Sequence, residues 1–369
     1  MNSKLSTGQK CHNRSDHNDK STQKKRSKLL KETKITDINC DCLEKIFEYL
    51  AIGDLLNVDD SNKWLKLAAA IVFGRKFGHK NVKITDIYPK YGALSERDGT
   101  IVVGGLKTCL QFLRCFGESV KKLDVSFVDS TKKHHSHVDE YINDYCADSL
   151  GQLRVYGRLT SLMKDISKPF SAVESLCFEE CVLGSKLTQF NVWFPRLRHL
   201  VLFTNCLNPT SIQVSFPYLE HLATEINHGR STDIGTENLK MALGGNPQLR
   251  SLYIRVDTAE KFVFDDFIEV ICQNPFIDNL QTHWYYTHTF HNSDVLCRIA
   301  KALPSLTELH FTGLVFKNVE IARFLDQHKS LKKFSFVLSM GYAYKFLQSV
   351  LGNIWNVSRD RNNLITLQR

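Results

Sequence analysis

A short apolar motif that recurs along residues 82–369 constrains the fold of this chain more than any other feature. It has the form L-x-x-L-x-L, in which Val, Ile or Phe can replace Leu, and successive copies begin 22 to 30 residues apart. A repeat of this length is typical of chains whose units stack and bury one continuous core. The copies are Val120/Leu123/Val125, Leu150/Leu153/Val155, Val173/Leu176/Phe178, Leu197/Leu200/Leu202, Leu219/Leu222/Thr224, Leu249/Leu252/Ile254, Ile277/Leu280/Thr282, Leu306/Leu309/Phe311 and Leu331/Phe334/Phe336.

In five of these copies, a proline stands at the same place relative to the motif. Proline ends a helix and favours extended backbone around it. The segments upstream, such as 265–273 and 293–303, have helical spacing and contain no proline. Each unit is therefore predicted to run strand, turn, helix and proline before the next strand. The prolines that stand two residues before a copy are Pro195, Pro217, Pro247, Pro275 and Pro304.

Residues 35–80 have a helical pattern instead of the repeat. Asn39 is predicted to cap a first helix and Gly53 to end it, and a single turn follows from Asp54. A third helix, capped by Asp60 or Ser61, carries Trp64, Leu65, Ala68, Ile71 and Val72. Three helices in about 45 residues seldom make a stable core alone, so this module is expected to pack against the rest of the chain. The first helix has an apolar face made of Leu43, Ile46, Phe47 and Leu50.

Residues 36–64 resemble the F-box, the helical module through which substrate receptors dock on the small adaptor of cullin-based ubiquitin ligases. The match has no gaps, and the stretch 54–58, Asp-Leu-Leu-Asn-Val, is especially similar to the family. The resemblance implies an adaptor-binding surface formed by Ile38, Leu43, Ile46, Leu50, Leu55, Leu56 and Val58.

The repeats that follow resemble the leucine-rich repeats that commonly follow an F-box. One copy continues through Asn205 to Leu207, and another has Cys181 in the place of the asparagine. The resemblance implies that this Asn or Cys side chain turns inward and satisfies backbone groups between units. The expected fold is α/β, a small helical F-box followed by a leucine-rich-repeat solenoid with parallel strands inside and helices outside. The expected domains are a disordered basic tail over 1–34, the helical module over 35–80 and the solenoid over 81–369.

Strand alternation predicts which residues face solvent. If the second and third apolar positions point inward, the residues beside them lie on the open, concave face of the sheet. Tyrosine and arginine are favoured at the centres of protein interfaces, which makes this face the expected target-binding surface. It could instead be covered by another repeat or by residues 342–369. The target-binding residues expected here are Tyr156, His199, Phe203, His221, Tyr253, Arg255, His283, Tyr285 and His310.

The positive charge is concentrated at one end of the chain. Residues 1–34 hold ten Lys or Arg against three acids, so most of the net charge of +9 lies there. The nearly neutral remainder lacks the basic surface that drives nucleic-acid binding. A nuclear nucleic-acid-associated protein is therefore the third hypothesis, and the basic cluster 24–28 is either a nuclear import signal or a solvated charge run.

The residues that carry chemistry in other proteins do not form a catalytic or metal site here. The 11 cysteines are scattered, most of them in apolar segments, which favours reduced core residues. Residues 132–137, Lys-Lys-His-His-Ser-His, are predicted to be a solvated loop, and Gly104-Gly105 a turn before a helix. The catalytic motifs of hydrolases, metalloproteases and dinucleotide-binding enzymes are missing from the sequence. The chain is therefore expected to be non-enzymatic, with no cofactor and no metal.

These features predict the substrate-recognition subunit of a cullin-type ubiquitin ligase, whose partners are the adaptor, the cullin and an unidentified protein target. The alternative is a leucine-rich-repeat scaffold that binds proteins without promoting degradation. The sequence has neither a run of 18 apolar residues nor a signal-peptide core. The expected location is the cytoplasm, the nucleus or both, without secretion or membrane association.

Overall fold

The computed structural model describes residue 35 and residues 38–58, 62–85, 94–127, 135–157, 166–181, 189–203, 215–227, 239–257, 264–289, 295–316, 318–337, 342–360 and 364–369. The predicted tail over 1–34 lies outside these residues, as do Asp60, Ser61, Asn205 and Leu207.

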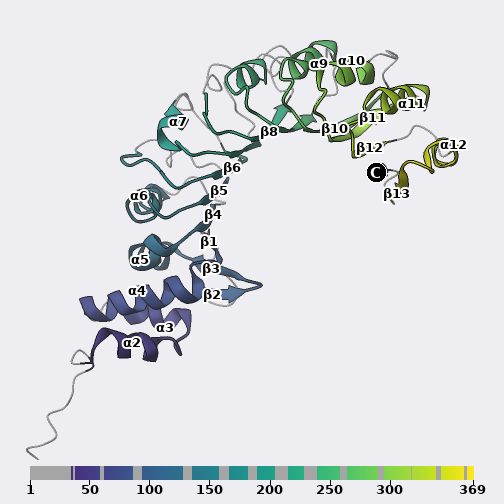
Figure 1. Ribbon diagram of the computed structural model, residues 1–369. Helices are drawn as coiled ribbons and strands as arrows, with labels where there is room; N and C mark the ends of the chain where they lie inside the picture. Colours follow the sequence, from purple (N-terminus) through teal and green to yellow (C-terminus); the bar gives the residue numbers. More distant parts are fainter. Residues whose placement is uncertain are drawn as a thin grey trace, which may run out of the picture.

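The described residues form a curved α/β structure in which the strands line the inner side of an arc and the helices of the repeating part lie on its outer side (Figure 1). One sheet of 14 strands runs through the described residues in the order β13-β14-β12-β11-β10-β9-β8-β7-β6-β5-β4-β1-β3-β2. The expected α/β class is confirmed. The strands are β1 Asn81–Thr85, β2 Leu94–Arg97, β3 Thr100–Gly104, β4 Lys122–Ser126, β5 Gln152–Tyr156, β6 Ser175–Glu179, β7 His199–Phe203, β8 His221–Asn227, β9 Ser251–Asp257, β10 Asn279–Thr289, β11 Glu308–Val315, β12 Lys333–Val337, β13 Asn356–Arg359 and β14 Leu364–Gln368.

Helices connect most of these strands. Apolar side chains of the connecting helices enter the core, where Phe112, Phe267 and Phe324 are buried. The helices are α2 Cys40–Phe47, α3 Ile52–Asn57, α4 Lys63–Phe77, α5 Leu106–Phe116, α6 His135–Cys146, α7 Phe190–Trp193, α9 Phe264–Cys272, α10 Val295–Ala302, α11 Asn318–Gln327 and α12 Tyr342–Leu351, with a 3₁₀ turn η3 at Gly117–Ser119.

Every copy of the apolar motif forms a strand, from β4 to β12, as the sequence predicts. These strands are parallel and in register, so that the second apolar position of each copy lies beside that of the next. All of these second-position side chains are buried and form one continuous row in the core. The row consists of Leu123, Leu153, Leu176, Leu200, Leu222, Leu252, Leu280, Leu309 and Phe334.

Two copies have threonine at the third apolar position, and the structure buries it there. Thr224 and Thr282 are 8% and 0% exposed. The hydroxyl of Thr282 accepts a hydrogen bond from Nε1 of Trp284 at 3.1 Å, which satisfies two buried polar groups at once. The motif therefore keeps its strand geometry where the apolar pattern weakens.

Turns with proline separate the helices from the strands, as predicted. Pro195, Pro217, Pro247, Pro275 and Pro304 all lie in turns. Polar side chains join successive turns. Buried Asn246 accepts from the backbone N–H of Phe216 at 2.8 Å and donates to the carbonyl of Ala242, and Asn274 donates to the carbonyl of Asn246.

Cys181 performs the inward role that the repeat resemblance implies. Its thiol is buried and donates to the carbonyl oxygens of Val155 at 3.4 Å and Glu179 at 3.3 Å. These contacts join β5 to the residue that follows β6.

The two ends of the sheet depart from the repeating pattern. At the N-terminal end, β1 lies between β3 and β4 and is parallel to both, and β2 forms an antiparallel hairpin with β3. The hairpin turns at Asp98 and Gly99, whose φ angles are 47° and 75°. At the C-terminal end, β14 pairs antiparallel with β12, and β13 pairs with β14. The described strands of the C-terminal segment therefore extend the sheet beyond β12.

The helical module shares its core with the repeating part. Phe73 of α4 stacks on Phe116 of α5 with ring centroids 4.2 Å apart and packs edge-on against Phe112 at 5.5 Å. Gln111 of α5 donates to the carbonyl oxygen of Leu56 in α3. The expectation that this module packs against the rest of the chain is confirmed, and the core has no break at residue 80.

The predicted beginnings and ends of the first helices are confirmed only in part. Asn39 caps α2 by accepting from the N–H of Cys42 at 2.8 Å, as predicted. Gly53 does not end that helix, since α2 ends at Phe47 and Gly53 lies inside α3. The cap of α4 is Asn62, which accepts from the N–H of Trp64.

Two further expectations concern residues 104–106 and 132–137. Gly105, with φ of 80°, makes the predicted turn between β3 and α5. The expected loop over 132–137 is wrong in its second half, because His135 begins α6. Lys132, Lys133 and His134 lie outside the described residues.

Leu202→Asp should lower the free energy of unfolding by more than about 3 kcal/mol, because it places an unpaired carboxylate in the core behind β7. His199→Ala, on the exposed side of the same strand, should cost less than about 1 kcal/mol. Thermal and urea unfolding followed by circular dichroism would measure both. Equal losses would mean that the strand faces are assigned wrongly.

Candidate functional site

The concave face of the sheet is the first candidate binding surface. Along most strands of the repeating part, buried side chains alternate with partly or fully exposed ones, as in the patterns of β5 and β9. The exposed side faces away from the helices and lines the inner side of the arc (Figure 1). All the residues expected to bind a target lie on this side and are at least partly exposed, namely Tyr156, His199, Phe203, His221, Tyr253, Arg255, His283, Tyr285 and His310. Their role in binding remains a prediction.

Five of these residues form a group across β7, β9 and β10, which we call the concave cluster: Phe203, Tyr253, Arg255, His283 and Tyr285. The Arg255 guanidinium lies over the Phe203 ring, 3.9 Å from its centroid. Phe203 and Tyr253 meet edge to face at 5.9 Å. The intervening strand β8 carries a small residue, Ala223, beside Tyr253.

His283 and Tyr285 complete the cluster from β10. Their rings meet edge to face at 4.9 Å, and Nδ1 of His283 is 2.6 Å from the Thr312 hydroxyl on β11. The pairing of β10 with β11 shifts register between His283 and His288. Gly313 lies beside this irregularity with φ of 79°, and a Cβ at that position would overlap the carbonyl oxygen of Trp284. A bulge of this kind redirects side chains and is frequent near binding sites.

The other predicted residues lie outside the concave cluster. His199 and His221 stack on neighbouring strands with centroids 4.3 Å apart and planes 8° apart. His310 lies on β11, beside Gln281. Tyr156 lies on β5, where it interacts with Glu180 rather than with the cluster.

Burial and nearby positive charge act on three of the histidines. The pKa of His199 is lowered by burial and by His221. The pKa of His283 is lowered by burial and by Arg255, and that of His310 by burial, Lys333 and His283. These three imidazoles are therefore neutral at pH 7, so they can donate or accept hydrogen bonds without adding charge to the concave face.

The second candidate surface is on the helical module, where the expected adaptor-binding residues divide between the core and the surface. Leu43, Leu55 and Leu56 are 1%, 0% and 4% exposed, because they form the core between α2, α3 and α4. A docked protein would reach them only if the module opened, and their role in adaptor binding remains a prediction. Ile38, Leu50 and Val58 are partly buried against the same core.

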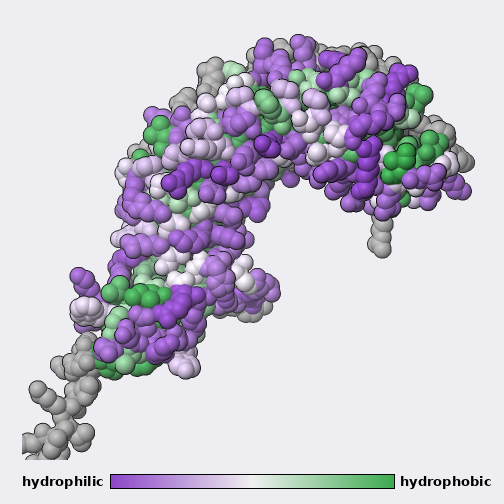
Figure 2. Space-filling view, viewed as in Figure 1, coloured by the Kyte–Doolittle hydropathy of each residue, from purple (hydrophilic) through white to green (hydrophobic). Residues whose placement is uncertain are grey.

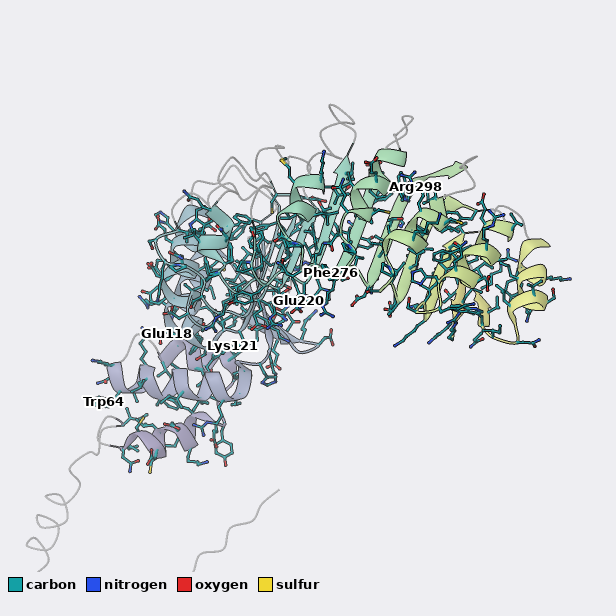
Figure 3. All side chains as sticks on the ribbon, turned by 45° about the horizontal axis from the view of Figure 1, so that its top comes forward. Trp64, Glu118, Lys121, Glu220, Phe276 and Arg298 are labelled. Atoms are coloured by element: carbon teal, nitrogen blue, oxygen red, sulfur yellow. The ribbon has the colours of Figure 1, made fainter. Side chains whose placement is uncertain are left out.

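Ile46 is the one expected adaptor-binding residue with a largely exposed side chain, at 46%. Three further apolar side chains on α4 and one in the turn after α2 are exposed, and Figure 2 shows hydrophobic colour gathered at this end of the arc. Trp64 lies on the helical module, far along the arc from the concave cluster (Figure 3). We call this set the outer helical patch: Ile46, Tyr49, Trp64, Leu67 and Ile71.

The sequence assigned Trp64 and Ile71 to the same apolar set as Leu65, Ala68 and Val72, although the structure places the two groups on different sides of α4. Leu65, Ala68 and Val72 are buried, whereas Trp64 is 62% exposed. The sequence contained a sign that α4 has apolar residues on two sides. The apolar residues of α4 cover more than one face of the helix, and a helix that is apolar all round is normally covered on both sides.

Polar contacts fix α2 against α4 beside the outer helical patch. Arg75 of α4 forms ion pairs with Glu44 and with Glu48, the latter at 2.8 Å. Lys76 donates to the carbonyl oxygens of Glu48 at 2.7 Å and Leu50 at 3.1 Å, where it satisfies the C-terminal end of α2. The patch is therefore held on two helices that cannot move independently.

In the part of the chain that the structure describes, no three His, Cys, Asp or Glu side chains come together as metal ligands would. Cys146 and Cys177 have pKa values raised to about 12, mainly by burial, so their thiols stay protonated. Within the same described residues, none of the helices has the length and apolar character needed to span a bilayer.

Comparison with models of known protein families finds no match to this chain. Comparison with curated proteins finds no match either.

The lowered histidine pKa values predict how stability depends on pH. Folded His310 resists protonation, whereas in the unfolded chain it binds a proton near its ordinary pKa of 6.5. Acidification from pH 7 to pH 5 should therefore destabilise the fold, and His310→Gln should make the fall in Tm smaller. Thermal unfolding of both proteins across this range would test it. A fall in the variant as large as in the wild type would contradict the assignment.

Proposed function

We propose that this chain is a substrate receptor of a cullin-type ubiquitin ligase. In this proposal the helical module, residues 35–80, is an F-box that docks on the adaptor, and residues 81–369 are a leucine-rich-repeat solenoid that binds a target protein. The chain itself catalyses no step. It brings the target close to a separate ubiquitin-carrying enzyme and so raises the effective concentration of the two reactants.

The observation that carries the proposal is the outer helical patch. Tyr49, Trp64 and Leu67 are 90%, 62% and 48% exposed, although the opposite face of the same helices is buried in the core. Trp64, Leu67 and Ile71 recur at i, i+3 and i+7 on one exposed face of α4, and large apolar side chains on an exposed surface mark protein contacts. Ile46, Tyr49 and Trp64 lie within the segment whose sequence resembles the F-box, and Leu67 and Ile71 follow it on the same helix as Trp64, so both features favour the same adaptor-binding role.

The shared core between α4 and α5 supports the proposed mechanism. A receptor that works by proximity must hold its target at a defined distance from the adaptor. The stacking of Phe73 on Phe116 and the hydrogen bond from Gln111 to Leu56 join the helical module to the sheet without a linker. This connection favours a fixed separation between the outer helical patch and the concave cluster.

The concave cluster supports target binding. Aromatic rings and an arginine that stand on a solvated sheet face have no core to fill, and these residue types dominate the energetics of protein interfaces. The C-terminal strands β13 and β14 continue the sheet beyond β12 and leave this face uncovered by described residues. The repeating units thereby offer a preformed curved surface of the kind that solenoid proteins use for binding.

Leu67→Glu combined with Ile71→Glu should abolish co-purification of the adaptor, because two carboxylates in an apolar contact cost several kcal/mol. Both side chains are exposed, so the fold should persist. Val319→Glu on α11, 63% exposed and far from the patch, is the matched control. The test is pull-down with purified adaptor and cullin. If the wild-type chain does not bind adaptor at micromolar concentration, the F-box assignment fails.

Tyr253→Ala should lose target capture while Tm and adaptor binding stay unchanged. The side chain stands on the exposed side of β9 and contacts only the concave cluster among the described rings. Tyr218→Ala, an exposed tyrosine in the turn before β8, is the control and should capture targets normally. Quantitative mass spectrometry of bound proteins while degradation is blocked would compare them. A wild-type set of partners on the Tyr253 variant would rule out the concave face.

A further inference from the structure

Arg255 is held rigidly in the concave cluster. The flat face of its guanidinium covers the Phe203 ring at 3.9 Å, and its Nε donates to the Tyr253 hydroxyl at 3.5 Å. These contacts occupy the face of the guanidinium and its Nε–H. The two terminal nitrogens make no hydrogen bond with a described side chain, so the fork of N–H donors is left for another acceptor.

The ion pairs among the described residues do not include Arg255, and the carboxylate beside it in the strand register is that of Glu225, whose charge acts on the guanidinium. Three other acids of the concave face have polar side-chain partners. Asp124 accepts from Asn81 at 2.7 Å, Glu179 from Arg154 at 2.9 Å, and Glu308 from Asn279 at 3.2 Å.

Other charged groups surround this arginine and limit what can bind. Glu225 is its partner on β8 in the strand register, and Asp257 follows it on β9. His283 is its partner on β10, and His310 and Lys333 lie beyond it on β11 and β12. The two carboxylates oppose any anion here and oppose a doubly charged one most strongly, so a singly charged group must be bound through the directed N–H donors of the guanidinium.

We propose that Arg255 anchors a carboxylate side chain, aspartate or glutamate, of an extended segment of the target. A planar guanidinium fork matches a carboxylate with two parallel hydrogen bonds, and stacking on an aromatic ring fixes it in advance. Phe203, Tyr253 and Tyr285 then provide contact area for the neighbouring residues of that segment. The inference rests on the proposed function, since it assigns the chemistry of the target that the concave face would bind.

The test is selection of random 12-residue peptides on the full chain, with a second library that contains one phosphoserine. Peptides from the wild-type chain should be enriched in Asp or Glu at one position. Replacing that acid by its amide should weaken binding about tenfold or more, the effect of losing one charge-assisted pair. Arg255→Gln should cause a similar loss, after which the peptide replacement should have little further effect. Arg255→Lys, which lacks the fork, should recover only part of the affinity.

Arg154→Gln is the matched control, because Arg154 lies on the same face but is already paired with Glu179. It should bind the selected peptides as the wild type does. Equal acid enrichment on Arg255→Gln, a preference for phosphoserine, or peptides that need Tyr253 but no acid would each overturn the carboxylate assignment and leave the proposed function intact. If no selected peptide depends on Tyr253, the target-binding surface itself is wrong, and the inference falls with it.

Discussion

The strands from β4 to β12 place equivalent side chains side by side, and the rest of the structure depends on this alignment. Parallel pairing sets Leu200 beside Leu222 and Leu222 beside Leu252, all buried between the sheet and the helices. Backbone bonds outside the strands repeat the same step, since the N–H of Arg198, Glu220 and Arg250 each donates to a carbonyl one unit earlier at 2.9 Å. A shift by one residue would expose this row, so the core fixes the register.

The concave surface follows from that register. Because side chains alternate along a strand, burying one set of positions forces the other set onto the open face. Arg255 and His283 become neighbours, although 28 positions separate them in the sequence, because β9 and β10 pair in register. Tyr253 and Phe203 meet across β8, although they stand on strands that do not pair with each other. The chemistry of this face therefore depends on the exposed strand residues of several repeats together. A single repeat shows only the apolar motif.

The sequence predicted the strands of the repeating part, their faces and their turns, because each depends on residues within one unit. It did not predict β1 and β3, since Val82 and Ile101 pair through a contact between segments without the motif. It also did not distinguish Leu55 from Trp64. Both belong to apolar helical patterns, but Leu55 is buried and Trp64 is exposed, and only the packing of α2, α3 and α4 decides between them. The sequence predicted that the residues of the concave cluster lie on the open face. It did not predict which of them touch, because their contacts depend on how neighbouring strands pair.

The shared core also fixes how α4 and α5 are placed relative to each other. Phe73 contacts Phe77, Phe112 and Phe116, so one aromatic group supports both α4, which carries most of the outer helical patch, and α5, which leads into β4. Phe73 and the row of buried leucines belong to one continuous core. Close-packed interiors have low compressibility and transmit strain. The packing therefore favours a fixed relative orientation of α4 and the sheet, which is what the proposed receptor would need.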